Sequence, residues 1–404
     1  MSLNNTLHFF TNGFPFGKGE QFITDEIPLL ANAFDEIVIY VSPSFGAISP
    51  LNYELPPNII VKRVDFDQYI PVKNRAWKAV LLLAYEMFHS KQKSKYLFHL
   101  KKHWFIALEI VGQAMQLKEQ FESSPTICYT YWFDHWTNVL AVAKRHYFPT
   151  LKLVTRAHGF DLDARQVPRG YYPFRNHTLS QLNNIVAVSS VGEKLLIQDN
   201  PKYAGIITRE YLGVNTFGVC NTHQKKEEEF TIVSCSALIP LKRVDKIIEI
   251  LDKVRLSVTW VHFGDGPEYT HVKKLAKQLP SNIQVVWKGH VSNNEILKFY
   301  KHYWVDAFIH LSSLEGIPIA LMEAAAFGIP LFAVDTGGVK EVVNEQTGVL
   351  LQEEDLSINA ANLLTKLLKN NAQNYAFRAE ISAYIKSIFY AQSNHQLFIN
   401  KYLK

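Results

Sequence analysis

The sequence predicts an α/β protein of two domains, each built on a doubly wound parallel sheet. Three observations support this class. The chain has 404 residues, which exceeds the usual size of one domain. Its hydrophobic content of 48% is enough for two sizeable cores. Short, almost continuous apolar runs alternate with amphipathic segments, as in βαβ units whose sheet is covered on both faces.

The alternation is clearest in the second half of the chain. We expect strands at 231–237, 258–264, 283–289, 306–312 and 330–334, with helices at 244–254, 267–279, 292–302 and 339–343. A further helix follows the fourth strand. Pro318 suits its first position, and Gly328 with Pro330 would end it.

The first half shows a looser version of the same pattern. Strands are expected at 6–11, 36–42, 126–132, 151–159 and 184–190, with a helical insert at about 73–121. We therefore predict a first domain over 1–215, a polar linker over 216–230 and a second domain over 231–384. A final helix is expected over 385–404, and its return to the first domain is one arrangement that this division allows.

Composition excludes several classes of function. A net charge of +5 is too mild to indicate nucleic-acid binding, but it suits phosphate-bearing ligands or an anionic membrane surface. The three cysteines have no metal-ligand spacing. The first residues lack the pattern of a signal peptide, and the apolar run at 79–85 is too short to cross a bilayer. These features predict a reduced, cytoplasmic protein.

Unusual residues follow the expected strands of the second half. In such sheets ligands bind at the carboxyl ends of the strands. The loops there contain Lys242 and Arg243, then "GDGPE" (264–268), "GHV" (289–291), "SSLEGIP" (312–318) and "DTGG" (335–338). Glycines allow backbone amides to approach a ligand, and basic side chains neutralise phosphates. A ligand with both phosphates and hydroxyls, such as a nucleotide-sugar, fits this edge.

Two glutamates flank the start of the predicted helix after the fourth strand. Glu315 lies in the turn before it and Glu323 on its second turn, among apolar neighbours. A buried carboxylate is costly unless something binds it. Both could accept hydrogen bonds from ligand hydroxyls, or they could be a capping acid and a surface glutamate. These residues alone leave both interpretations open.

The second half resembles glycosyltransferase family four, of the bacterial surface-polysaccharide type. Glu315 and Glu323, with seven residues between them, carry the resemblance, together with "AFGIPLFAVDTGGVKEVVNEQTGVLL" after them and "KGHVSNNEILKFYKHYWVDAFIHLSSLEG" before them. In the first half it rests on "PFGKGE" (15–20) and "RAHGFD" (156–161). The resemblance implies the GT-B fold, in which two Rossmann-like domains face a cleft, and a retaining transfer of a sugar.

The resemblance also implies roles for individual residues. His158, Lys242 and Glu315 would be catalytic, with Lys242 neutralising the departing diphosphate, Glu315 contacting the transferred sugar and His158 approaching it from the first domain. Glu323 would hold the ribose hydroxyls. The donor-binding set would comprise Gly17, Gly19, Arg243, Gly264, His290, Val291, Gly316, Ile317, Pro318, Ile319 and Glu323.

One position departs from the family pattern. Ala237 stands where the family usually has an arginine that clamps the diphosphate. Arg243 or Arg156 could substitute, or the donor would be held more weakly. The resemblance implies no cofactor and no metal, and the acids of "DFD" (65–67) and "DLD" (161–163) are interpreted as ordinary loop residues.

The acceptor side is predicted from the first half. Between 73 and 104, eight basic residues and six aromatic residues accompany one acid, Glu86. This mixture suits peripheral contact with an anionic membrane, but a helix pair with one solvated face would look similar. Asp134 and His135, in "TYWFDHW" (130–136), are candidate acceptor-binding residues. The acceptor would be a saccharide or a lipid-linked saccharide, at the inner face of the membrane if contact occurs.

Three functions are therefore compared. The leading one is a retaining hexosyltransferase that takes a hexose or N-acetylhexosamine from a UDP-sugar in preference to a GDP-sugar. A sugar-nucleotide epimerase would use the same donor site without an acceptor. A catalytically weak scaffold that acts through a partner is the non-enzymatic alternative, and Ala237 is its motivation.

Overall fold

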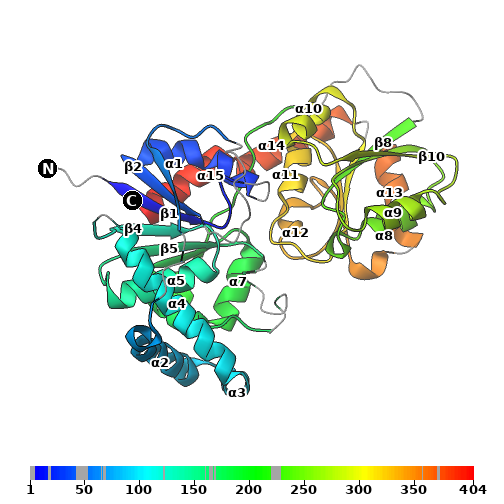
Figure 1. The fold of residues 1–404 in the computed structure, drawn as a ribbon. Helices are drawn as coiled ribbons and strands as arrows, with labels where there is room; N and C mark the ends of the chain where they lie inside the picture. Colours follow the sequence, from blue (N-terminus) through cyan, green and yellow to red (C-terminus); the bar gives the residue numbers. More distant parts are fainter. Residues whose placement is uncertain are drawn as a thin grey trace. The chain divides into compact units, whose positions relative to one another are not determined.

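The computed structural model describes residues 5–16, 20–41, 53–64, 66, 70–121, 123–159, 161–162, 167, 170–219, 229–356, 358–370 and 374–404. The chain forms two compact units (Figure 1). Unit 1 comprises Met1–Val188, Gly192–Glu210 and His395–Lys404, and unit 2 comprises Ser189–Val191 and Tyr211–Asn394. Each unit has one parallel sheet with helices, which confirms the predicted α/β class.

Unit 1 has a seven-stranded parallel sheet in the order β3-β2-β1-β4-β5-β6-β7. The strands are β1 (Thr6–Thr11), β2 (Glu36–Val41), β3 (Ile59–Arg63), β4 (Ile127–Thr130), β5 (Lys152–Ala157), β6 (Asn184–Ala187) and β7 (Ile207–Arg209). Five of these strands were predicted, and the two edge strands β3 and β7 were not. The order reverses between β1 and β4, so the loops after these strands start at the centre of the sheet.

Helices cover both faces of this sheet. They are α1 (Ile27–Ala33), α2 (Val72–His89), α3 (Lys93–Phe98), α4 (Leu100–Gln120), α5 (His135–His146), α6 (Arg175–Gln181) and α7 (Ser190–Asp199). Successive side chains of a strand point to opposite faces. Phe9 accordingly packs in the core beneath α1, whereas Phe10 packs in the core shared with α4 and α5.

Unit 2 has a six-stranded parallel sheet in the order β10-β9-β8-β11-β12-β13. Its strands are β8 (Glu229–Cys235), β9 (Ser257–Phe263), β10 (Ile283–Gly289), β11 (Ala307–His310), β12 (Leu331–Val334) and β13 (Gly348–Leu351). Its helices are α8 (Val244–Leu251), α9 (Tyr269–Ala276), α10 (Asn293–His302), α11 (Ile319–Ala326), α12 (Val339–Val342), α13 (Ile358–Asn370) and α14 (Tyr375–Phe389). The five predicted strands are present, and β13 is an addition at the edge.

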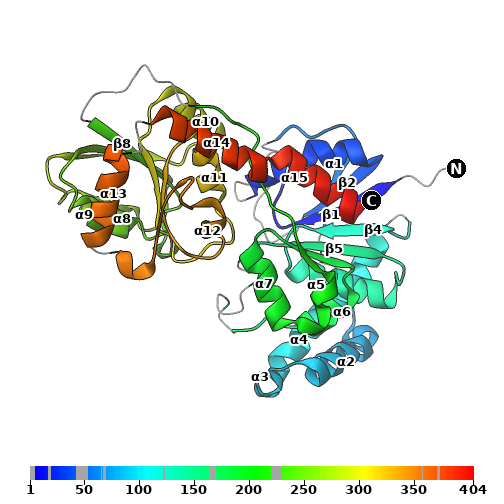
Figure 2. The same cartoon turned by 180° about the vertical axis from the view of Figure 1, so that it is seen from behind.

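The end of the chain completes the core of unit 1. Helix α15 (Ala391–Phe398) continues into a π-helical turn (Ile399–Leu403) and lies beside α1 in both views (Figures 1 and 2). Phe398, Ile399, Tyr402 and Leu403 are buried in the same core as Leu7 and other residues of β1 and β2. No helix in the described part of the chain is long and apolar enough to cross a membrane.

Candidate functional site

The loops that follow β8 and β11 are joined at the carboxyl edge of the unit 2 sheet. The amide of Ser313 donates a hydrogen bond to the carbonyl of Leu241 at 2.9 Å. This bond places Lys242 beside Glu315, and the Nζ of Lys242 lies 2.6 Å from Oε1 of Glu315. Two of the three residues expected to be catalytic are therefore in contact in the protein.

His310, the last residue of β11, contacts the same carboxylate. Its Nε2 lies 2.8 Å from Oε1 of Glu315, and its side chain is only 5% exposed. Burial alone would raise the pKa of Glu315, but the hydrogen bonds and charges of His310 and Lys242 lower it to about 2. Both contacts use Oε1, and Oε2 accepts no hydrogen bond from the described residues. An ionised carboxylate with one free oxygen can accept hydrogen bonds from a ligand hydroxyl.

The loop after β12 supports the loop of Glu315 through glycines. Gly338 donates its amide hydrogen to the carbonyl of Gly316 at 2.7 Å. Gly337 has a φ of +54°, and a Cβ there would lie 1.8 Å from the carbonyl oxygen of Glu315. Only glycine permits this close approach. The close packing of the two loops thus explains why the "DTGG" segment contains glycines, which the sequence alone did not explain.

Helix α11 begins at Ile319, one residue later than expected, because Pro318 occupies the N-cap position with extended backbone. It ends at Ala326, and Gly328 follows with a φ of +71°, as predicted. The amides of its first turn have no intrahelical acceptors and favour an anion. Gly316 and Ile317 directly precede this turn, so the predicted donor-binding residues 316–319 lie together.

Glu323 is half-buried on the second turn of α11. Its Oε1 accepts a hydrogen bond from Nδ2 of Asn293, at the start of α10, at 2.6 Å. Cys235, at the end of β8, is close enough that burial and then the charge of Glu323 raise the pKa of its thiol to about 12. Asn293 was not predicted, since an exposed asparagine at a helix start is usually only a turn residue.

The loops after β9 and β10 hold the other expected donor-binding residues. Gly264 has a φ of +137° and donates its amide hydrogen to the carbonyl of Gly289 at 2.8 Å. A Cβ at Gly264 would lie 1.8 Å from the carbonyl oxygen of Ser236. His290 is exposed and Val291 half-buried in the loop that follows. Their contacts with a donor remain predictions.

The structure shows the surroundings of Ala237, where the family usually has an arginine, and of Arg243, one of its two suggested substitutes. Ala237 is exposed after β8. Arg243 makes a two-pronged ion pair with Glu353, at 2.6 and 3.1 Å, and donates to the carbonyl of Leu311. The donor-binding role of Arg243 remains a prediction, and it requires the ion pair with Glu353 to break.

Arg156, the other suggested substitute, was wrongly placed. It is completely buried inside unit 1, where it pairs with Glu26 at 3.5 Å and lies over the ring of Phe398 at 3.9 Å. A guanidinium without exposed surface cannot contact a diphosphate.

In unit 1, His158 follows β5 as expected. Its ring stacks on Tyr131 at 4.6 Å and lies 4.4 Å from Trp132, measured between ring centroids. Asp161 accepts hydrogen bonds from the amides of His158, Gly159 and Phe133. Burial, only partly offset by Asp161, lowers the pKa of His158.

The interpretation of Asp161 as an ordinary loop acid was wrong, because it is buried and orders this loop. The other acids of the two motifs, Asp65, Asp67 and Asp163, lie outside the described residues.

A second acid, Glu20, organises the loop after β1. It accepts hydrogen bonds from the amides of Asn12, Gly13 and Phe14 and from the indole of Trp132. Sequence reasoning missed Glu20, because Trp132 is 112 residues away and only the sheet order brings them together. Gly17 and Gly19, in the same loop, lie outside the described residues.

Asp134 and His135 begin α5. Asp134 caps the helix through the amide of Trp136 and accepts from Nδ2 of Asn12 at 2.8 Å. Burial raises its pKa to about 7, although the Asn12 hydrogen bond opposes this. His135 contacts the amide oxygen of Gln113 on α4. Asp134 is thus tied to the loop after β1, and His135 to the helical insert.

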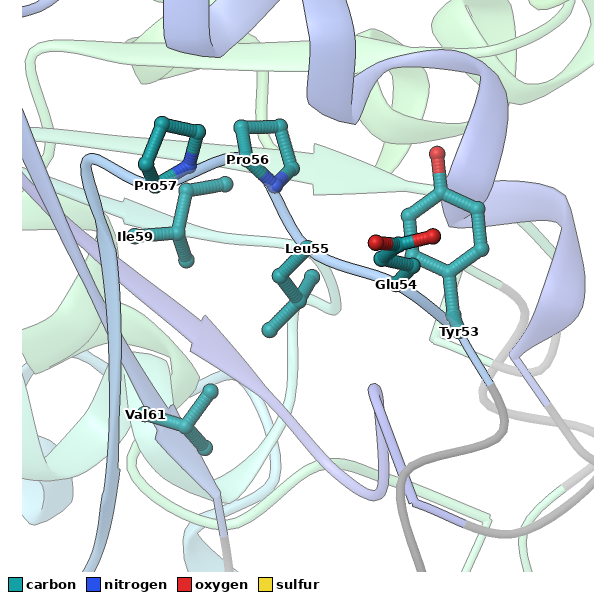
Figure 3. Close-up of a pocket in the computed structure, with 7 residues that line it drawn as sticks. All are labelled: Tyr53, Glu54, Leu55, Pro56, Pro57, Ile59 and Val61. Carbon is teal, nitrogen blue, oxygen red and sulfur yellow. The ribbon is translucent and has the colours of Figure 1, made fainter.

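A cavity of about 730 Å³ lies along the edge strand β3 (Figure 3). Tyr53, Glu54 and the mostly apolar residues up to Val61 line it. It contains none of the predicted donor or acceptor residues, and we assign it no role.

Comparison with known proteins identifies the unit that carries Lys242, Glu315 and Glu323. Residues 221–387 match the family model of the glycosyl transferases group 1. The match lies within unit 2 and leaves unit 1 outside it. This match supports the predicted glycosyltransferase family and enzyme class for unit 2.

Curated relatives align with the chain at low identity. N-acetyl-alpha-D-glucosaminyl L-malate synthase of Bacillus anthracis is 26% identical over 60% of this chain and 66% of its own length. The GtfA subunit of the UDP-N-acetylglucosamine–peptide N-acetylglucosaminyltransferase of Streptococcus agalactiae is 24% identical over 46% of this chain. That alignment spans 37% of the GtfA subunit, so the chain covers less than two thirds of these relatives.

Solved structures of glycosyltransferases share the fold along the whole chain. The lipopolysaccharide outer core galactosyltransferase WaaB superposes with a TM-score of 0.63 over 98% of this chain and 99% of WaaB, at 16% identity. Anabaena Alr3699/HepE in complex with UDP-glucose gives 0.65 over 98% of each chain, at 14% identity. These matches confirm the GT-B architecture.

Proposed function

We propose that the chain is a retaining glycosyltransferase that transfers a hexose or N-acetylhexosamine from a UDP-sugar. The observation that carries this proposal is the cluster of Lys242, His310 and Glu315 beside the first turn of α11, within the family domain. A GDP-sugar is the less favoured donor. The UDP-glucose complex of the structurally similar HepE supports this order.

The cluster suggests how the transfer proceeds. Oε2 of Glu315 accepts hydrogen bonds from hydroxyls of the transferred sugar, while Glu323 accepts them from the ribose. As the bond between the anomeric carbon and the diphosphate breaks, Lys242 turns towards the phosphate oxygens and stabilises the developing charge. The acceptor oxygen bonds to the same face of the sugar, and its proton passes to the departing phosphate. His158 is the residue of unit 1 that we propose for the reaction.

The proposed acceptor is a saccharide or a lipid-linked saccharide in the synthesis of a surface polysaccharide or glycoconjugate. WaaB, a lipopolysaccharide outer core galactosyltransferase, supports this class of product. Asp134 and His135 are the proposed acceptor-binding residues. We place the reaction at the cytoplasmic face of a membrane, and the surface that supports membrane contact is described in the next subsection.

We further propose that no metal ion takes part, because Lys242 and the amides of α11 can neutralise the diphosphate. Purified enzyme treated with EDTA should transfer sugar at the rate of untreated enzyme. Loss of activity that Mg²⁺ or Mn²⁺ restores would contradict this part of the proposal.

A panel of UDP- and GDP-sugars tests the function. Thermal shift reports binding, nucleotide release reports turnover, and NMR of the released sugar reports its anomeric configuration. One UDP-sugar should stabilise and turn over with retention, and Glu323→Ala and Lys242→Ala should abolish this response. Conversion of the free nucleotide-sugar into its epimer would favour the epimerase. Absence of any response would favour the scaffold.

A further inference from the structure

We infer that the insert formed by α2, α3 and α4 docks unit 1 on an anionic lipid bilayer. The docking face is defined here by five exposed apolar side chains: Trp77, Leu81, Phe88, Phe98 and Phe105. This inference goes beyond the proposed sugar transfer and does not depend on the identity of the donor.

Helix α2 has two apolar faces. Ala79, Leu82 and Leu83 point into the core of unit 1. Trp77, Val80, Leu81, Ala84 and Phe88 are exposed and follow the spacing i, i+3, i+4, i+7 and i+11. Residues at this spacing share one side of a helix. A helix that only packed on the unit 1 core would have a polar outer side, so the second face requires another partner.

The exposure on this face is large. Trp77 is 69% exposed, Phe88 77% and Phe98 84%. Figure 1 shows α2 and α3 on the outside of unit 1, with α4 and α5 between α2 and the sheet. A groove of about 510 Å³ between α2 and α4 is continuous with this side, since Val80 and Ala84 line it together with Leu100 and Trp104.

The insert is held firmly enough to present these side chains. Tyr96 of α3 is completely buried, and its hydroxyl accepts a hydrogen bond from the amide of Phe174 at 2.8 Å. Glu86, the one acid of α2 and α3, is 1% exposed and accepts hydrogen bonds from Asn176 and from the amide of His177. It therefore contributes no negative charge to the surface, and the exposed acids of the insert are Glu109 and Glu119 on α4.

The charges around the face select an anionic partner. Exposed lysines lie on all three helices and in the turn between α2 and α3, at Lys73, Lys91, Lys93, Lys95, Lys101 and Lys102. Lysines near an anionic membrane favour binding, while aromatic side chains enter the interface. A second copy of this chain is a poorer partner, because its face would bring the same positive charges into opposition.

Vesicle sedimentation tests the inference with the full chain. Vesicles of phosphatidylglycerol and phosphatidylethanolamine should bind the protein, phosphatidylcholine vesicles should bind it weakly, and added salt should release it. Phe88→Ser combined with Phe98→Ser should weaken binding about tenfold or more, since each ring loses a buried position in the lipid. Leu397→Ser, at a 51% exposed site on α15, is the matched control and should bind as the wild type does.

A second pair of variants tests how much the charges of the lysines contribute to vesicle binding. Lys93→Glu with Lys102→Glu should weaken binding at least tenfold, because each lysine contributes a factor of about five near the surface. Lys274→Glu with Lys277→Glu makes the same charge change in unit 2 and should have little effect. Thermal unfolding shows that each variant is folded.

Two results would overturn the inference. The first is that both insert variants bind anionic vesicles as strongly as the wild type does, or that the wild type does not bind vesicles at all. The second is a dimer in sedimentation velocity that Phe88→Ser with Phe98→Ser dissociates, since a second copy would then cover the face.

Discussion

At the residue scale, Glu315 is the centre of the proposed donor site. Lys242 and His310 both contact its Oε1, and together they keep the carboxylate ionised far below neutral pH. Such an arrangement fixes the side chain and leaves Oε2 for a ligand. Removing the charge should therefore affect the transferred sugar more than the nucleotide.

Glu315→Gln should lower the rate of sugar transfer about a hundredfold, since a preorganised electrostatic contact to the reacting sugar is lost. Its affinity for UDP should stay close to that of the wild type, because Glu323 is the proposed ligand of the nucleotide. Steady-state kinetics and calorimetric titration with UDP measure the two effects. Equal losses of kcat and UDP affinity would show that Glu315 acts on the nucleotide instead.

Asp134 makes stability depend on pH. Burial raises its pKa from 3.8 to about 7 in the folded protein. Its contribution is therefore fully present below about pH 4 and is lost as the pH rises through 7. The free energy of unfolding of the wild type, relative to Asp134→Asn, should fall between these values and then level off. Asparagine keeps the helix cap, and urea titrations at several pH values provide the measurement. Parallel pH profiles would contradict the assignment.

The positions of Glu315 before α11 and of Glu323 on its second turn could be predicted from the sequence, because the signals for this helix are local. His310 could not, although it is five residues from Glu315. A histidine at the end of a buried strand normally belongs to the core, and only the turn of the loop brings Glu315 back to it. Asp161 was misinterpreted for a related reason, since its amide donors include Phe133 in another loop.

At the scale of elements, glycines set the spacing between loops. The loop after β12 packs on the loop of Glu315 so closely that Gly337 has no room for a side chain. This contact links a stretch of glycines to the geometry of the proposed active site.

Gly337→Ala should destabilise unit 2 by about 1–3 kcal/mol, because the new Cβ collides with the Glu315 carbonyl and the positive φ is strained. It should also weaken donor binding. Gly205→Ala is the control, since the space that its new Cβ would occupy is open to 4 Å and its φ is not positive. Chemical unfolding measures both variants. Similar stabilities for the two would mean that the loop relaxes without cost.

The central strands of both sheets and the edge strand β10 were predicted, whereas the edge strands β3, β7 and β13 were not. Central strands are buried on both faces and appear as continuous apolar runs. Strand β3 is partly exposed along its length and carries Lys62 and Arg63, and β7 has only three residues. Their pairing depends on the neighbouring strand more than on their own composition.

At the scale of the whole molecule, the last residues of the chain complete the first core. Phe398→Ala should destabilise unit 1 by about 3–5 kcal/mol, because a fully buried ring beside Tyr129 leaves a cavity. Leu397→Ala is the exposed neighbour on the same helix and should have little effect. In thermal unfolding, Phe398→Ala should therefore lose much more stability than Leu397→Ala. Equal transitions would mean that the C-terminal turn is not part of the unit 1 core.

The central claim is that unit 2 binds a uridine nucleotide through Glu323 and Lys242. Calorimetric titration with UDP tests it most directly. The wild type should bind, Glu323→Gln and Lys242→Ala should each lose at least tenfold in affinity, and the exposed control Glu354→Gln should bind normally. Undiminished binding by both site variants, or no binding of UDP by the wild type, would contradict the proposed donor site.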